Sequence, residues 1–313
     1  MTDLVQYLLD GLVSGSLYVL LALGFTLVFG VMGIMNVAHA DLYMLAAFTF
    51  VWVGQDAGLG SVLGVVAGAA AAVGVGYLVF VLVLRRIDRS ATVALFVSTL
   101  GVSYVLENVV AKVTDYHARS VTPIFEPTLH RVGGLRVTDA DALVFVAALL
   151  TGLALLTWLR RSSTGRLLRA VSESPSLASL VGIDTRRMMG IAILLASLVA
   201  GLGGVLVANQ TQGIDPFVAN DVSLKMFAVA VVAGVGSVGG AIVVGFGLFG
   251  SVYLTPLFLG TVRGYNSLQI GQIMSVGGIA MFIGGPIAGA LIRKVDPRIV
   301  KAFGLSIAAI GLY

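Results

Sequence analysis

Long apolar stretches recur along this chain, each about as long as a helix that crosses a membrane. A helix needs roughly 20 apolar residues to cross the hydrocarbon core of a bilayer. Only 11% of the residues are charged and 58% are hydrophobic, whereas typical soluble proteins have about 25% and 45–50%. We therefore predict an all-α, polytopic bundle of membrane helices, with full-length spans at 11–34, 61–84, 91–111, 142–159, 188–208 and 268–292.

Three further apolar stretches do not have the length of a single crossing. Residues 41–53 and 302–313 are short, whereas 225–260 is too long for one helix. The middle of the long stretch, 233–240, is rich in glycine and predicts a break. The chain is thus expected to have roughly eight or nine membrane segments, including one or two short or broken ones.

The distribution of Lys and Arg predicts how the spans are oriented. The loops at 85–90, 160–187 and 293–301 carry an excess of basic residues, whereas the loop at 112–141 is balanced in charge. Short basic loops stay on the cytoplasmic side of a membrane. We therefore expect these three loops inside, and the loop at 112–141 and the N-terminus outside.

A polar group, Asn36, His39 and Asp41, separates the first span from the short segment that follows it. Polar residues beside a short or broken membrane helix are a pointer to a binding site, because free backbone groups are tolerated there only inside protein or at a cavity. Ionisable residues within a membrane also suggest function. These three residues are candidates for a substrate path. The alternative interpretation is a solvent-exposed turn that caps the next helix.

The basic loop at 160–187 contains the pattern of a short amphipathic helix. Pro175 suits a first helical turn, and Gly182 follows the last apolar residue, as expected at a helix end. Leu177, Leu180 and Val181 share one face. Such a helix either lies on the membrane surface or docks into a groove of a soluble partner.

Catalytic, metal and cofactor signatures are missing from the sequence. There is no Cys, and the three His have no metal-binding spacing. The glycines at 234–239 match a dinucleotide fingerprint, but that fingerprint works only between a strand and a helix, so we expect close packing there, as for the Gly64 and Gly68 pair. Clustered basic residues on a polar face, which nucleic-acid binding requires, are not evident. We predict a membrane protein that is not an enzyme.

Residues 7–43 closely resemble the start of bacterial branched-chain amino acid ABC transporter permeases. Asn36, Ala38, His39, Met44 and Leu45 match the motif of that family, whereas Ala40 replaces its usual glycine. Three later blocks agree, at 98–101, 164–184 and 227–241. The resemblance implies a multi-pass protein of the bacterial inner membrane that imports apolar amino acids by alternating access.

The same resemblance implies the partners. A second permease subunit would complete the path, a periplasmic amino-acid-binding protein would deliver substrate, and cytoplasmic ATPase subunits would bind the ATP. Residues 173–184 would be the loop that contacts an ATPase subunit. Its candidate residues are Glu173, Leu177, Ala178, Leu180, Val181 and Gly182.

The resemblance changes after about residue 241. Residues 245–254, 264–271 and 285–298 resemble a helix pair of major-facilitator drug:proton antiporters. We therefore expect a permease-like part, 1–241, joined to a C-terminally truncated major-facilitator-like fragment, 242–313. The alternatives are a fragment of a proton-coupled secondary drug transporter and a non-functional chimeric membrane protein. The antiporter is disfavoured because Glu107 and Asp141 are expected near helix ends rather than deep in a span.

Overall fold

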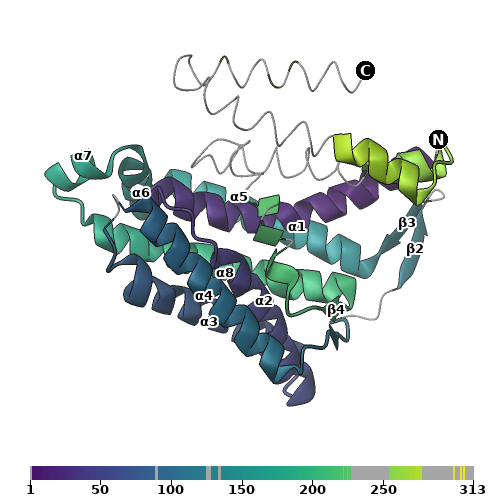
Figure 1. Cartoon of the computed structure of the whole chain (residues 1–313), viewed down its shortest axis with the longest axis horizontal. Coiled ribbons are helices and arrows are strands. Elements are labelled where there is room, and N and C mark those ends of the chain that lie inside the picture. The colour runs from purple at the N-terminus through teal and green to yellow at the C-terminus, as the bar shows by residue number, and fades with distance from the viewer. Residues whose placement is uncertain are drawn as a thin grey trace. The chain divides into compact units, whose positions relative to one another are not determined.

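Helices dominate the computed structural model of the chain (Figure 1). The structure describes residues 2–88, 91–124, 128–132, 135–220, 222, 223, 225, 226, 254–276, 299, 304 and 306. The chain divides into two compact units, 1–253 and 254–313. The helices of the first unit are α1 (Thr2–Met32), α2 (His39–Phe50), α3 (Ser61–Val79), α4 (Thr92–Val113), α5 (Asp139–Arg161), α6 (Ser163–Glu173), α7 (Pro175–Leu180) and α8 (Thr185–Thr211). Two π-helical turns, η1 (Val51–Asp56) and η2 (Phe80–Leu84), extend α2 and α3.

Five described helices are long and apolar enough to cross a membrane. They are Val5–Met32, Ser61–Leu84, Thr92–Val113, Asp139–Arg161 and Thr185–Thr211. These spans confirm the first, third, fourth, fifth and sixth segments predicted from the sequence, with ends that differ by a few residues. The short second segment corresponds to α2 and η1. Most of the segments predicted after residue 225, including the glycine-rich 233–240, lie outside the described residues.

Burial separates the five spans into a centre and a periphery. The most apolar stretches of α1 and α8 are 72% and 61% buried, whereas those of α3, α4 and α5 are each 28% buried. The exposed surface of the peripheral helices is nevertheless apolar and includes Val66, Val105 and Leu150. Water would not favour such a surface, but lipid does. The chain is therefore a multi-pass membrane protein.

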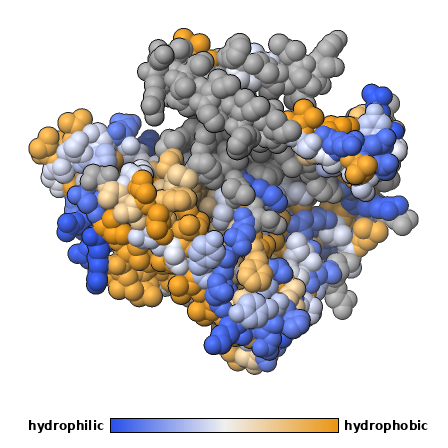
Figure 2. All heavy atoms as spheres, viewed as in Figure 1, coloured by the Kyte–Doolittle hydropathy of each residue, from blue (hydrophilic) through white to orange (hydrophobic). Residues whose placement is uncertain are grey.

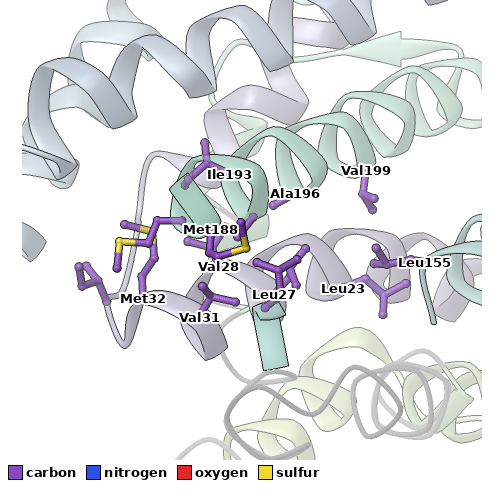
Figure 3. Close-up of a cluster of buried hydrophobic side chains, with 14 of the residues drawn as sticks. Leu23, Leu27, Val28, Val31, Met32, Leu155, Met188, Ile193, Ala196 and Val199 are labelled. Carbon is purple, nitrogen blue, oxygen red and sulfur yellow. The ribbon is translucent and has the colours of Figure 1, made fainter. Parts of the chain in front are cut away.

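The largest apolar cluster joins α1 to α5 and α8. Leu23 and Leu27 of α1 lie against Leu155 of α5 and Val199 of α8 (Figure 3). Towards the other end of the cluster, Val28, Val31 and Met32 meet Met188 and Ile193 (Figure 3). This packing joins α1 to α8, and α2 packs in a second cluster, in which Tyr43 and Met44 lie with Phe25 of α1 and Val205 of α8.

Small residues bring α3 close to α2 and α8. A side chain placed on Gly68 would put its Cβ 2.6 Å from the carbonyl oxygen of Ala46, and one on Gly64 would come within 2.9 Å of Phe50. Gly76 and Ala72 continue the buried face. Close approach of helices through small residues is a common packing mode in membranes, so the predicted role of Gly64 and Gly68 is confirmed.

Gly68→Val should therefore destabilise the protein, because its side chain must displace the backbone of α2. Overpacking of this kind typically costs about 1–3 kcal/mol of unfolding free energy. Gly74 lies on the same helix, and a Cβ added to it would have no neighbouring atom within 4 Å, so Gly74→Val is the matched control. The midpoint of thermal unfolding in detergent should fall for Gly68→Val and stay close to wild type for Gly74→Val; equal midpoints would contradict this packing.

Short strands lie at one end of the first unit, where the sequence predicted only a polar loop. β2 (Leu129–Val132) and β3 (Leu135–Thr138) form an antiparallel hairpin, and β1 (Arg119–Ser120) pairs with β4 (Gly213–Ile214). The Gln6 side chain forms two hydrogen bonds with the backbone of Arg136. Its Nε2 donates to the Arg136 carbonyl oxygen at 2.8 Å, and its Oε1 accepts from the Arg136 N–H at 2.6 Å. The N-terminus thus lies at the same end as the loop at 112–141, as the charge distribution predicted, and α6 and α7 lie at the opposite end (Figure 1).

The second unit contains a helical hairpin. Residues 254–261 and 267–276 are helical, and 262–266 form the exposed turn between them. Asn266 and Gln269 cap the second helix reciprocally, with N–H to side-chain oxygen distances of 2.9 and 3.0 Å. Arg263 thus lies in an exposed turn. The predicted junction near 241 falls among residues that the structure does not describe.

Candidate translocation site and coupling segment

The connection between α1 and α2 carries the first group of candidate residues. Gly33 ends α1 with a φ of +67°, a conformation that favours glycine. Asn36, His39 and Asp41 are 3%, 1% and 0% exposed. Such burial does not fit the alternative interpretation of a solvent-exposed turn. All three side chains lie inside the protein, at or before the first turn of α2.

His39 lies between α1 and α8. A Cβ added to Gly24 of α1 would lie 2.7 Å from His39 Nε2 and 2.9 Å from the carbonyl oxygen of Ala196 in α8. The ring of His39 is 6.4 Å from that of Phe25. Its Nε2 is buried and has no hydrogen-bond partner among the described residues. The absence of a side chain at Gly24 is what makes room for this imidazole.

Asp41 faces a polar stripe on α4. Thr99, Ser103 and Glu107 are four residues apart, so they share one face of that helix, and all three are buried. Ser103 and Glu107 are the α4 residues whose side chains lie near the Asp41 carboxylate. Both Asp41 oxygens and Glu107 Oε1 are buried without a hydrogen-bond partner in the described part of the chain.

Thr99 links this stripe to the α1–α2 connection. Its Oγ1 accepts a hydrogen bond from the Val37 backbone N–H at 3.3 Å and lies 3.0 Å from the Phe96 carbonyl oxygen. We call the buried polar residues of the connection, α2 and α4 the polar cluster: Asn36, His39, Asp41, Thr99, Ser103 and Glu107. Within it His39 faces α1 and α8, whereas Asp41 faces α4.

The polar cluster is costly for a membrane protein to maintain. A buried polar group without a partner costs about 1–3 kcal/mol, and more when it is charged. Ionisable residues in membrane segments are rare and usually mark a substrate or ion pathway. Unpaired carboxylate, amide and imidazole atoms can bind the ammonium and carboxylate of a small zwitterion. These side chains are therefore the candidates for contact with a polar ligand.

Half of this cluster was not predicted from the sequence. Glu107 lies in the last two turns of α4, near the helix end as expected, but its side chain is buried. The four-residue spacing of Thr99, Ser103 and Glu107 was the available signal. Asp141 does lie near a helix end, as expected, in the capping box with Thr138 at the start of α5.

The second candidate group is the coupling segment, residues 173–184, at the opposite end from the strands. The predicted short helix is present as α7, with Pro175 in its first turn and the Ser174 hydroxyl accepting from the Leu177 N–H at 3.3 Å. Gly182 follows with a φ of +85°. The helix α6, which comes before α7, was not predicted from the sequence. Glu173 is the last residue of α6 and is exposed.

An apolar face of the coupling segment is open. Leu177, Leu180 and Val181 are 64%, 81% and 76% exposed, whereas Ala178 is buried and holds α7 against its neighbours. Exposed large apolar side chains side by side mark a surface for another protein or for lipid. Both interpretations made from the sequence, docking and membrane contact, agree with this exposure.

Known proteins place the chain in a family. A sequence profile described as the permease component of branched-chain amino acid transport systems matches residues 7–276. The high-affinity branched-chain amino acid transport system permease protein LivH of Escherichia coli is 28% identical over 269 residues, which cover 82% of this chain and 87% of LivH. BraD of Pseudomonas aeruginosa, a permease of the same description, is 28% identical over 253 residues, 77% of this chain and 82% of BraD.

A shorter match is to a protein of a different kind. The colistin resistance protein EmrB of Acinetobacter baumannii is 42% identical over 71 residues, which make up 23% of this chain and 14% of EmrB. No solved structure matches the chain significantly. The permease profile extends past residue 241 and covers well over half of the chain. This chain therefore belongs to the family of permease components of branched-chain amino acid transport systems.

Proposed function

We propose that this chain is the membrane permease subunit of an ABC importer for branched-chain amino acids. The observation that carries the proposal is the family match over residues 7–276, together with the buried polar cluster, in which Asn36, His39, Asp41 and Glu107 have atoms without a hydrogen-bond partner among the described residues. Leucine, isoleucine and valine are zwitterions with an apolar side chain. A path for them needs a few polar groups within an apolar bundle, which is what this unit contains.

The energy source and the partners follow from this proposal. Separate cytoplasmic ATPase subunits bind the ATP and contact the coupling segment, a second permease subunit completes the path, and a periplasmic binding protein delivers the amino acid. The chain lies in the bacterial inner membrane, binds no cofactor and catalyses no reaction of its own. The exposed Leu177, Leu180 and Val181 support the ATPase contact.

Asn36→Leu and His39→Leu should each reduce uptake of labelled leucine if these residues line the path or hold its bend. The loss of a polar partner in a buried site costs about 1–3 kcal/mol, so we expect roughly tenfold slower uptake. The assay is ATP-driven uptake into proteoliposomes that hold the complete transporter. Asn108, an exposed residue of α4, provides the control Asn108→Leu. Wild-type uptake in both test variants, at equal amounts of inserted protein, would remove them from the path.

For the C-terminal part we propose a major-facilitator-like fragment, 242–313, joined to the permease-like part, 1–241. The 71 residues of the EmrB match equal the length of that fragment to within one residue, which supports a foreign C-terminal part, while the permease profile continues to residue 276. The same match favours a fragment of a drug:proton antiporter as the second candidate function. Helices from another fold should pack loosely against the permease, because membrane interfaces depend on close fit.

Protease added from the outer face should therefore cut first at the exposed turn 262–266, beside Arg263. The fragment before residue 241 should survive, and its size is measured by mass spectrometry. A chain that resists cleavage as one unit would contradict the division.

A further inference from the structure

Four arginines converge where α3 ends and α8 begins. Arg85 and Arg86 follow the η2 turn, and Arg186 and Arg187 lie in the first turn of α8. Cations at a helix N-terminus oppose the helix dipole, so the pair on α8 does not serve the stability of that helix. In the described part of the chain, none of the four forms an ion pair. A cluster of positive charge is thus left without a partner in that part of the protein.

These arginines line two adjoining hollows of the first unit, which together we call the arginine groove. One, of about 500 Å³, is lined by Arg85, Arg186 and Arg187 at one end and by Tyr77, Ile191 and Leu194 further along α3 and α8. The other, of about 410 Å³, adds Arg86 and shares Phe80, Arg85 and Arg186 with the first. In Figure 2 a hydrophilic strip at the left edge adjoins a broad hydrophobic surface.

The backbone shapes this groove in two ways. In the π-helical turn the Arg85 N–H donates to the Phe80 carbonyl oxygen at 2.8 Å, which widens the last turn before the arginines. Gly190 of α8 has no side chain, so the ring of Phe80 packs against it; an added Cβ would lie 3.3 Å from that ring. Phe80 thus forms the buried floor of the groove, while Tyr77 is left half-exposed at its wall.

The two acidic residues at the groove do not cancel its charge. Asp184 is engaged as the N-cap of α8, where its Oδ1 accepts from the Arg187 N–H at 3.0 Å. Asp88 lies at the rim of the smaller hollow. Four arginines against these two carboxylates leave the groove positive.

We propose that the arginine groove binds an anionic phospholipid. Its phosphate would lie between Arg85 and Arg186, because a guanidinium binds phosphate oxygens in a bidentate manner. An acyl chain would follow the apolar wall of Tyr77, Ile191 and Leu194 into the bilayer. Basic pockets between membrane helices on the cytoplasmic side suit anionic headgroups, and the charge distribution assigns this end to that side. A soluble anion would use the arginines but not the apolar wall.

Native mass spectrometry of the full-length chain, titrated with phosphatidylglycerol, tests the proposal. Each arginine in contact with the lipid headgroup should contribute about 1 kcal/mol, roughly fivefold in affinity, so Arg85→Gln/Arg186→Gln should weaken binding roughly 25-fold. The control Arg161→Gln/Arg166→Gln removes the same charge from the exposed ends of α5 and α6, outside the groove, and should bind as wild type. Equal weakening in both variants would show that lipid binding depends on surface charge in general rather than on the groove, and would overturn the proposal.

Two further arms separate lipid from other occupants. Phosphatidylcholine, which has the same chains but no net charge, should bind weakly to wild type and should not distinguish the variants. Inorganic phosphate at millimolar concentration should fail to displace phosphatidylglycerol, because it makes no use of the apolar wall. Displacement by phosphate would show that the site binds a soluble anion instead. Undiminished lipid binding by Arg85→Gln/Arg186→Gln would show that the groove does not bind lipid, and a protein partner would then be the remaining occupant. These outcomes do not depend on whether the chain transports amino acids.

Discussion

Leu180→Asp should abolish co-purification of the ATPase subunit while the protein still inserts into the membrane. Leu180 is the most exposed apolar residue of the coupling segment, 81% accessible, so its replacement removes a contact without disturbing the fold around it. An aspartate buried at an interface without a partner costs several kcal/mol. A helix of six residues has few other contacts with which to offset that cost.

The adjacent position gives a matched control for this experiment. Ser179 is also exposed on α7 but lies off the apolar face, so Ser179→Asp introduces the same charge one residue away. We expect it to retain the ATPase. Membrane fractionation should give equal amounts of all three proteins. If Leu180→Asp also retains the ATPase, the apolar face contacts lipid rather than a soluble partner, and the docking assignment is wrong.

Glu107→Met is expected to reduce leucine uptake by roughly a hundredfold without lowering stability. The Glu107 carboxylate is buried on α4, repels that of Asp41, and has an oxygen without a hydrogen-bond partner among the described residues. Asn220 interacts with Glu107, but one carboxylate oxygen is unpaired within the described residues, so an apolar residue of similar size should cost little stability, whereas losing a polar contact to a charged ligand costs about 3 kcal/mol. The substitution should therefore reduce uptake of leucine and leave the stability of the protein unchanged.

The measurement pairs uptake with thermal unfolding of the same preparation. Asn108→Met, next along α4 on its exposed face, serves as the control and should change neither quantity. If Glu107→Met loses stability along with uptake, then Glu107 has a structural role, and the polar cluster is not held for a ligand. If it transports leucine normally, the α4 stripe does not line the path.

Local signals in the sequence predicted α7 well. Pro175 at the start and Gly182 after the end act within one or two turns, so their effect does not depend on the rest of the fold. The same is true of the spans, whose length and apolar character are set by the bilayer. The helix α6 was missed although the sequence carries a signal for it: Leu168 and Val171 recur at helical spacing among polar residues, and Ser162 caps the first turn.

Which face of each span points inward could not be predicted from one sequence. The spans are apolar all around, because lipid and protein interior favour similar side chains. The four-residue spacing of Thr99, Ser103 and Glu107 indicated a shared face of α4 but not that this face lies against α2, and Val105 and Val109 on the opposite face gave no sign of exposure. The hairpin of β2 and β3 was missed for a related reason: short strands in a polar loop carry little periodicity.

Uptake of leucine by the reconstituted transporter distinguishes an ABC importer from a proton-coupled antiporter. Proteoliposomes would contain this chain with its second permease subunit and ATPase subunits, and the binding protein would be added outside with labelled leucine. We expect accumulation of leucine that requires ATP inside the vesicles, saturates with the binding protein, and is competed by isoleucine and valine. It should also be insensitive to collapse of the proton gradient. Uptake or efflux that follows the proton gradient and needs no ATP would contradict the assignment and favour the antiporter.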